Sequence, residues 1–195
     1  YLGPWLAQAG DRRRIVEALA LVLWETGKDV CSRDDLARVA GLPARKEPLL
    51  DPAEVGFFLI ITGDDHRFAH PSFCEFFLAR ALLEQMPARP AELLAVGRPT
   101  SERLEFLAHH IRRWKSDPGE SGFVRALQAW LTEGHHGAPV ERERHAKCTG
   151  HAVLYLHGLA RHLDVTRQWI PMGANLAGAD LSKSDLRGAR LGRIR

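Results

Sequence analysis

The sequence predicts a mainly α-helical chain with one β-hairpin and a short repeat at its end. Apolar residues recur at helical spacing through most of the 195 residues. A stretch near residue 60 is rich in β-forming residues around a turn, and leucines recur every five positions after residue 174. With 45% hydrophobic and 26% charged residues, the composition is that of a globular protein and excludes intrinsic disorder.

Three helix-start signals precede the hairpin. Asp11 is expected to cap a helix that runs to Trp24. Ser32 stands three residues before Asp35, which is a capping-box pattern at the start of a short helix. The third signal is a capping residue followed by proline and an acid, at residues 51–54.

The predicted hairpin pairs residues 57–62 with residues 66–69 around a turn at 63–65. Short helices followed by a hairpin are the order of a winged-helix domain, which we place at residues 1–86. A helix over residues 71–85 is expected to complete it.

A helical array is predicted over residues 87–170. Leu104, Leu107 and Ile111 define a helix from Ser101, as its cap, to Trp114. Two further helices are expected around apolar sets with the same spacing: Phe123, Leu127, Trp130 and Leu131, then Val153, Leu156, Leu159 and Leu163.

The C-terminal region, residues 171–195, has a period of five, which fits neither a helix nor a strand. From Ala174 it reads ANLAG, ADLSK, SDLRG and ARLGR. It is similar to pentapeptide repeats, and the resemblance implies the start of a four-sided, right-handed β-solenoid with each leucine and small residue inward. Because about one coil is present and solenoids need several, the repeat leucines are expected to be partly exposed: Leu176, Leu181, Leu186 and Leu191.

Residues 68–79 carry a second motif and read FAHPSFCEFFLA. The motif resembles the end of the winged-helix domain of NACHT-type STAND NTPases, where Phe-x-His-x-Ser/Thr-Phe-x-Glu-Phe/Tyr-aromatic/Leu-x-Ala recurs. The resemblance implies that His70 reaches ADP bound on a preceding NTPase domain, holds its β-phosphate and keeps the protein closed.

The same resemblance implies the cofactor and partners. ADP or ATP is expected on an NTPase domain N-terminal to Tyr1, and none on this segment alone. That domain in cis, other protomers on activation and an unknown trigger ligand are the expected partners. Bacterial STAND proteins that end in pentapeptide repeats are a known combination, so the implied function is a signalling switch with a repeat sensor, in a role such as antiphage defence.

The residues around His70 make this role physically reasonable. His70 precedes Pro71 at a predicted helix N-terminus, where unpaired N–H groups and the helix dipole favour an anion. A neutral imidazole can donate one hydrogen bond to a phosphate oxygen. The alternative is that His70 only caps the helix or packs against the hairpin.

Two further interpretations concern the next residues: Phe73, Phe76 and Phe77 are expected in the core, and Cys74 is expected to be buried and inert.

The sequence contains no Gly-x-x-x-x-Gly-Lys-Ser/Thr loop, so the segment is not expected to be an enzyme. The chain starts at tyrosine and is expected to be a segment of a longer protein. It has no basic region ahead of an apolar stretch and no apolar run near the about 20 residues that cross a bilayer. Its three cysteines are few and far apart. These observations predict a cytoplasmic protein without a membrane partner.

Two other functions remain open. One is a winged-helix DNA-binding regulator that uses residues 32–40 as a recognition helix, with Arg33 and Arg38 facing DNA. Asp34 and Asp35 in the first turn would meet phosphate, and the net charge of only +3 does not demand nucleic acid. The other is a helical protein-interaction scaffold.

One group of potential metal ligands occurs in the sequence. Two histidines and one cysteine are spaced by three (His145, Cys148 and His151), but Gly150 is expected to interrupt their helix. No metal ligands are therefore assigned.

Overall fold

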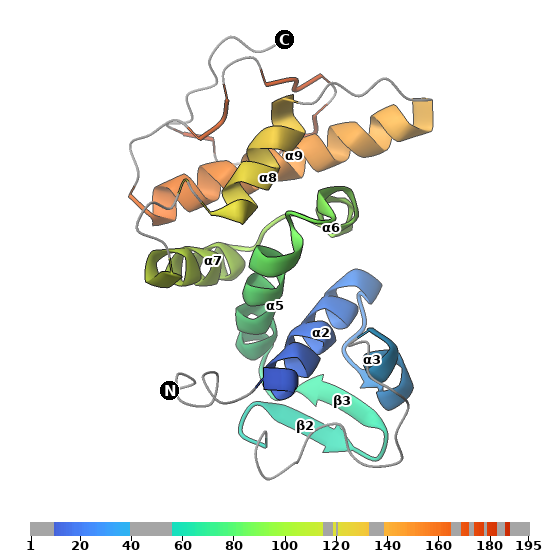
Figure 1. Ribbon diagram of the computed structural model, residues 1–195. Coiled ribbons are helices and arrows are strands. Elements are labelled where there is room, and N and C mark those ends of the chain that lie inside the picture. The colour runs from blue at the N-terminus through green and yellow to red at the C-terminus, as the bar shows by residue number, and fades with distance from the viewer. Residues whose placement is uncertain are drawn as a thin grey trace. The chain divides into compact units, whose positions relative to one another are not determined.

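The computed structural model describes residues 10–39, 56–114, 119, 121–132, 139–164, 169–171, 174–177, 179–182 and 186–187. Within them the chain is mainly helical, with seven α-helices and a three-stranded sheet (Figure 1). The chain divides into two compact units: unit 1 is Tyr1–Ala81 and unit 2 is Leu82–Arg195. Among the described helices, none combines the length and the apolar character that crossing a membrane requires.

Unit 1 begins with α2, Gly10–Thr26, which ends two residues beyond its predicted end at Trp24. Its middle is buried nearly all round, from Ile15 to Leu23. Gly27 follows the helix with a φ of 65°, the left-handed conformation in which a glycine commonly ends a helix. The prediction that Asp11 caps this helix is wrong, because α2 already includes Gly10 and Asp11 lies within its first turn.

The next helix, α3, is Arg33–Val39. The backbone N–H of Asp35 donates to Oγ of Ser32 at 3.2 Å, and the same hydroxyl donates to the Asp35 carboxylate at 2.9 Å. The predicted pairing of Ser32 with Asp35 at this helix start is therefore confirmed. The helix start predicted at residues 51–54 lies outside the described residues.

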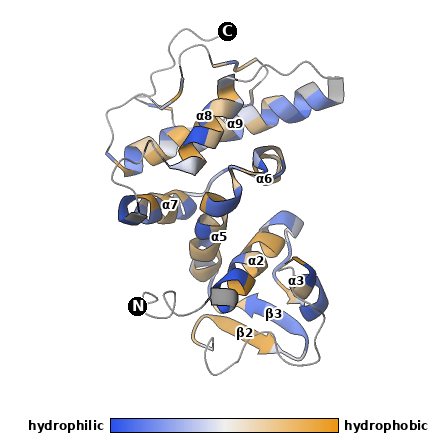
Figure 2. Cartoon of the chain, in the orientation of Figure 1, coloured by the Kyte–Doolittle hydropathy of each residue, from blue (hydrophilic) through white to orange (hydrophobic). Residues whose placement is uncertain are grey.

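The sheet of unit 1 contains β1 (Cys31–Ser32), β2 (Leu59–Thr62) and β3 (Asp65–Phe68) in the antiparallel order β1-β3-β2. The predicted hairpin forms, with Leu59 opposite Phe68, but its turn is only Gly63 and Asp64, and Asp65, which the sequence assigned to the turn, begins β3. Figure 2 shows that β2 is the apolar strand of the hairpin and β3 the hydrophilic one. Strand β1 was not predicted, because two residues are too short for any alternation to show.

The hairpin and α5 (Pro71–Gln85) share an aromatic core, and the bounds of α5 are those predicted. Phe77 is fully buried, with ring centroids 5.3 Å from Phe58 and 5.9 Å from Phe68. The expectation of a core position is wrong in degree for Phe73 and Phe76, which are only half-buried. They lie in the first two turns of α5, where every side chain from Ser72 to Phe76 is only partly covered.

Cys74 is also half-buried, so its predicted burial is wrong. Its place along the helix explains this, because residues 72–76 at the start of α5 are half-buried, whereas residues 77–82 are buried all round. The buried thiols are instead Cys31 and Cys148, and none of the three cysteines, all of them in described segments, is in a disulfide. Burial raises the pKa of the Cys31 and Cys148 thiols, which makes both poor nucleophiles.

Unit 2 contains α6 (Pro90–Val96), α7 (Ser101–Trp114), α8 (Gly122–Thr132) and α9 (Pro139–His162). Helix α9 is 24 residues long and packs against each of the other three. The predicted bounds of α7 are confirmed, but its cap is not Ser101. The N–H of Arg103 donates to Oγ1 of Thr100 at 3.0 Å, so the helix is capped one residue earlier than expected.

The expectation that Gly150 breaks a helix is wrong, because α9 continues through it. The helix predicted around Val153 to Leu163 is therefore only the second half of α9. Gly150 and Gly158 both stand where another chain segment approaches α9 closely: the backbone of Asp180 at the first, and the side chain of Leu104 at the second. These close approaches explain why glycine occupies two positions within a helix, although its helix propensity is low.

The repeat tract, which we define as residues 174–187, keeps its period in three dimensions. The Asn175 side chain accepts from the N–H of Ala177 at 3.1 Å, and five residues later Asp180 accepts from Ser182 at 2.9 Å. The predicted partial exposure is confirmed for the three described repeat leucines: Leu176, Leu181 and Leu186. Leu191 lies outside the described residues.

Candidate functional site

The candidate site residue, His70, connects the hairpin to α5 in unit 1. The N–H of Ala69 donates to the carbonyl of Phe58 at 2.9 Å, which extends the hairpin pairing up to His70. Pro71 then occupies the first position of α5, where its missing N–H costs nothing. His70 is thus held by the sheet on one side and by a helix start on the other, and its side chain is exposed.

The imidazole of His70 caps α5. The backbone N–H of Ser72 donates to Nδ1 of His70 at 3.1 Å, and the N–H of Phe73 donates to its carbonyl at 3.1 Å. Since Nδ1 accepts, the proton of the neutral ring is on Nε2. His70 therefore caps the helix through Nδ1, as the alternative interpretation has it, and its Nε2–H is left as a hydrogen-bond donor.

This geometry can serve a second purpose without conflict. An anion near the first turn of α5 would meet the positive end of a 15-residue helix together with the Nε2–H donor. The cap fixes the tautomer, and an orienting bond on one ring nitrogen is how proteins aim the other. The contact of His70 with a phosphate stays a prediction.

An exposed aromatic patch borders this site. Phe57 has 54% of its surface exposed, and its ring lies 4.4 Å from Phe58 and 6.5 Å from Phe73, between centroids. Phe73 belongs to the same first turn of α5 that His70 caps. The N-terminal end of α5 therefore combines a polar donor with an uncovered apolar surface.

A buried ion pair, which the sequence analysis did not identify, holds α5 in unit 1. Nε of Arg80 donates to Glu17 of α2 at 2.9 Å, and the two side chains are 3% and 6% exposed. Arg13, one turn before Glu17, adds a contact at 3.5 Å. The sequence did carry a signal for this pair, since one acid lies within an apolar helix and one arginine within another. Buried charges are normally paired, so the two residues could have been predicted as partners.

A buried histidine in β3, His66, was also missed. It is 3% exposed, and its Nδ1 donates to the carbonyl of Asp64 at 3.1 Å. Burial lowers the pKa of His66, and the nearby Arg33 acts in the same direction. His66 is therefore neutral at physiological pH and serves the sheet, where it lies opposite Cys31.

The two arginines assigned to DNA contact are engaged with acids. Arg33 forms an ion pair with Asp64 of the hairpin turn. Arg38 forms one with Asp35 at 2.6 Å, and hydrogen bonds from Arg38 and then Ser32 hold the pKa of Asp35 below its usual range. A DNA phosphate would have to compete with these carboxylates.

Cys148 and His151 of α9 face α6 through separate backbone contacts, whereas His145 lies against Trp130 of α8. Nδ1 of His151 donates to the carbonyl of Leu94 at 2.6 Å, and Sγ of Cys148 lies 3.7 Å from the carbonyl of Ala91. Burial lowers the pKa of His151, which keeps the ring neutral. In the described ranges, no three histidine, cysteine or acidic side chains come together as metal ligands would.

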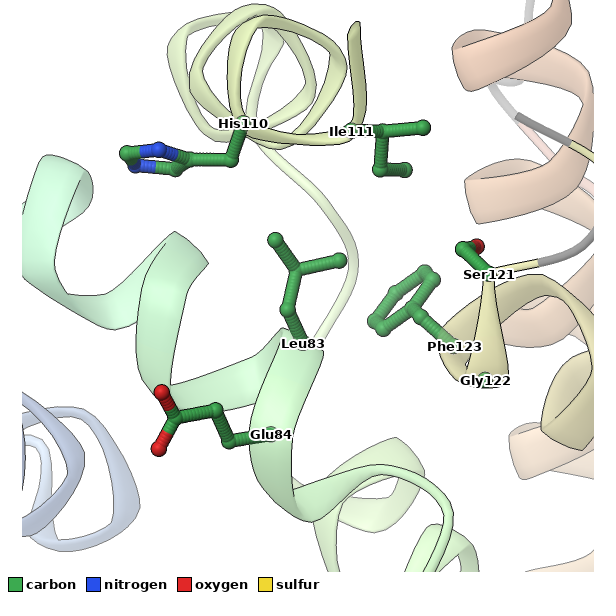
Figure 3. Close-up of a pocket in the computed structure, with 7 residues that line it drawn as sticks. All are labelled: Leu83, Glu84, His110, Ile111, Ser121, Gly122 and Phe123. Carbon is green, nitrogen blue, oxygen red and sulfur yellow. The ribbon is translucent and has the colours of Figure 1, made fainter. Parts of the chain in front are cut away.

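Unit 2 contains a pocket of about 210 Å³ that sequence analysis did not predict. Figure 3 shows Leu83 of α5 pointing into the space between α7 and α8, with Phe123 facing it from α8. The volume is below the roughly 300–1,000 Å³ of most ligand sites, and the lining carries no lysine or arginine. The pocket is unsuited to a nucleotide, and we assign it no function. Its lining residues are Leu83, Glu84, His110, Ile111, Ser121, Gly122 and Phe123.

Comparison with known proteins supports one part of the chain. The family described as pentapeptide repeats (8 copies) matches residues 172–193. This match agrees with the five-residue period and with the repeated side-chain bonds of the tract. Neither the curated proteins nor the solved structures contain a match to the chain.

Proposed function

We propose that this chain is the regulatory segment of a bacterial NACHT-type STAND NTPase, with a winged helix, a helical array and a pentapeptide-repeat sensor. In this proposal, the protein is cytoplasmic and ADP is bound by an NTPase domain in cis and contacted by His70. Exchange of ADP for ATP releases that contact, the winged helix rotates as a body, and protomers assemble to activate an effector. Antiphage defence is the proposed setting.

The topology of unit 1 supports the winged-helix part. Helix α2, strand β1 and helix α3 precede the hairpin, and β3 lies between β1 and β2. Helices followed by a hairpin are the order expected of a winged-helix domain, so this topology supports the proposal. The tight turn at Gly63, with a φ of 61°, forms the tip of the wing.

The observation that carries the proposal is the hydrogen bonding of His70. Because Ser72 occupies Nδ1, the neutral ring offers Nε2–H at the exposed start of α5. A β-phosphate is an anion with several acceptor oxygens, and a helix N-terminus favours it. The motif and the geometry therefore support the same residue.

The decisive experiment uses the full-length parent protein. His70→Ala is expected to lower ADP retention after purification and to raise basal effector activity, because it removes the Nε2 donor. His70→Asn is the matched variant, since asparagine can still cap α5 but places its amide differently. If His70→Ala retains ADP and has unchanged basal activity, the role assigned to His70 is wrong.

The DNA-binding alternative receives a separate test. Arg33 and Arg38 are paired with Asp64 and Asp35, so we expect no salt-dependent binding of duplex DNA by this chain. Fluorescence anisotropy with labelled DNA at 50 and 200 mM salt measures this. Binding whose affinity falls steeply with salt would favour the DNA-binding regulator.

A further inference from the structure

The repeat tract meets α9 at one residue. A Cβ atom at Gly150 would lie 2.7 Å from the carbonyl oxygen of Asp180 and 3.3 Å from its carbonyl carbon and nitrogen. These are backbone atoms of the repeat, so no rotamer change can make room for a side chain. Glycine is otherwise among the least favourable residues within a helix. The repeat backbone therefore occupies the space that a side chain at position 150 would need.

Arg98, just after α6, holds the same repeat from a second side. Its guanidinium donates to the carbonyl of Ser182 at 2.6 Å, to the Asp180 carboxylate at 2.8 Å and to the Asp180 carbonyl at 3.4 Å. Hydrogen bonds from the Ser182 side chain and backbone hold the pKa of Asp180 below its usual range, so the carboxylate stays charged. Two of the three contacts are to main-chain oxygens, so the arginine recognises the shape of the repeat as well as its charge.

The preceding repeat is bound to α8. The N–H of Asn175 donates to the carbonyl of Leu131 at 3.0 Å, and Ala174 beside it is 1% exposed. A side-chain bond from Gln128 to the carbonyl of Trp169, at 2.9 Å, fixes the chain that leads into the tract. Two consecutive repeats are therefore attached to the helices by different contacts.

Arg98 is in turn connected to the interior of unit 2. Its carbonyl accepts a hydrogen bond from Arg103 of α7 at 3.3 Å. Arg103 is 3% exposed, and the same nitrogen lies 3.4 Å from the hydroxyl of Tyr155, which is fully buried in α9. The contact with the repeat is therefore one step from the packed core between α7 and α9.

We propose that Arg98, Leu131 and Gly150 form a seat that fits the main chain of the first pentapeptide coil and locks it to the helical array. At Gly150 the absence of a side chain leaves room for the repeat backbone. At Leu131 a carbonyl accepts a backbone hydrogen bond, and at Arg98 the guanidinium donates to main-chain and carboxylate oxygens of the repeat. A displacement of this coil would be transmitted through Arg98 and Arg103 to α7 and to Tyr155 of α9. The seat stands apart from the nucleotide role proposed for His70 and does not depend on it.

Amide hydrogen exchange on the whole chain tests the seat, with the Asn175 amide as the reporter of docking. Gly150→Ala is expected to speed exchange at Asn175 by about tenfold or more, while amides of α9 stay equally or better protected because alanine favours the helix. Gly158→Ala is the matched control, since its new Cβ meets the side chain of Leu104 and no part of the tract. It is expected to leave Asn175 unchanged.

Arg98 is tested by a parallel set of variants. Arg98→Ala is expected to speed exchange at Asn175 by about threefold. Arg98→Lys is expected to give a smaller increase, because lysine keeps the positive charge but lacks the planar guanidinium that donates several hydrogen bonds at once. Arg112→Ala removes a similar exposed arginine that binds the carbonyl of His162, and should have no effect on Asn175.

Two outcomes would overturn the proposal. The first is unchanged exchange at Asn175 in both Gly150→Ala and Arg98→Ala. The second is an equal acceleration in the Gly158→Ala control, which would mean that Asn175 reports a general loosening of α9. If Gly150→Ala does not fold, the exposed Arg98 variants decide the question alone.

Discussion

Each unit contains an ion pair between residues far apart in the sequence, and the two pairs differ in their surroundings. Glu17 and Arg80 in unit 1 are 63 positions apart and nearly fully buried. Arg98 and Asp180 in unit 2 are 82 positions apart, and their side chains are 34% and 61% exposed. Water and salt screen the second pair and not the first. The buried pair therefore governs stability, while the exposed pair governs the position of a segment.

The largest expected effect comes from breaking the buried pair. Arg80→Ala should lower the free energy of unfolding of unit 1 by about 3–5 kcal/mol, because it leaves the carboxylate of Glu17 buried without its main partner. Hydrogen exchange of the α2 amides measures this in the whole chain. The double variant Glu17→Leu with Arg80→Leu should recover most of the loss. A double variant as unstable as the single one would mean that packing, and not charge, makes the pair important.

The buried histidines give each unit a dependence on pH. Burial lowers the pKa of His66 in unit 1 and of His151 in unit 2, so the unfolded chain binds a proton first as the pH falls. Stability is therefore complete above the ordinary histidine pKa of about 6.5 and falls below it, by at most about 1.4 kcal/mol per pH unit for each histidine.

Urea denaturation between pH 7.5 and pH 5 measures this dependence. His66→Gln should flatten the pH dependence of the stability of unit 1 alone, and His151→Gln that of unit 2 alone. If stability still falls with pH to the same extent in both buried-site variants, groups other than His66 and His151 cause the dependence.

The helix caps provide a comparison of intermediate size. Thr100→Ala should destabilise unit 2 by about 1 kcal/mol, and Ser32→Ala should destabilise unit 1 by a similar amount, because each removes the acceptor for an N–H in the first turn of a helix. Thermal unfolding of each variant measures the loss. Ser101→Ala should lower the free energy of unfolding by less than Thr100→Ala does. The reverse order would mean that Ser101, and not Thr100, caps α7.

The smallest expected effect is that of the exposed pair on global stability. Arg98→Ala should lower the free energy of unfolding by roughly 0.2–1 kcal/mol, and less at high salt, because both charges are hydrated. Denaturation at 0.05 and 0.5 M salt measures it. A loss as large as that of Arg80→Ala would contradict the comparison between the two pairs.

Local signals in the sequence predicted most of the elements. The capping pattern of Ser32 and Asp35, the glycine of the hairpin turn and the apolar spacing of α5 and α7 each act within a few residues, and the structure confirms them. At the candidate site, the sequence placed His70 at a helix N-terminus, and the structure adds the bond from Ser72 that fixes its tautomer.

The misses depend on contacts between distant segments. Gly150 was read as a helix breaker because nothing nearby in the sequence announces the backbone of Asp180. The pairing of Glu17 with Arg80 and the strand β1, which forms only against β3, are likewise long-range. Thr100 and Ser101 are adjacent residues that can both cap, and only the geometry of the preceding loop selects one of them.

The side-chain bonds repeated at Asn175 and Asp180 have a consequence for how this protein can change over evolutionary time. In the two repeats where the structure describes this bond, the turn is closed by the repeat's own side chain, so an added repeat of this kind needs no new partner in the helices. A tandem duplication of repeats downstream of Ser182 would leave Arg98, Leu131 and Gly150 untouched. The length of the repeat array is thereby free to vary independently of the body that carries it.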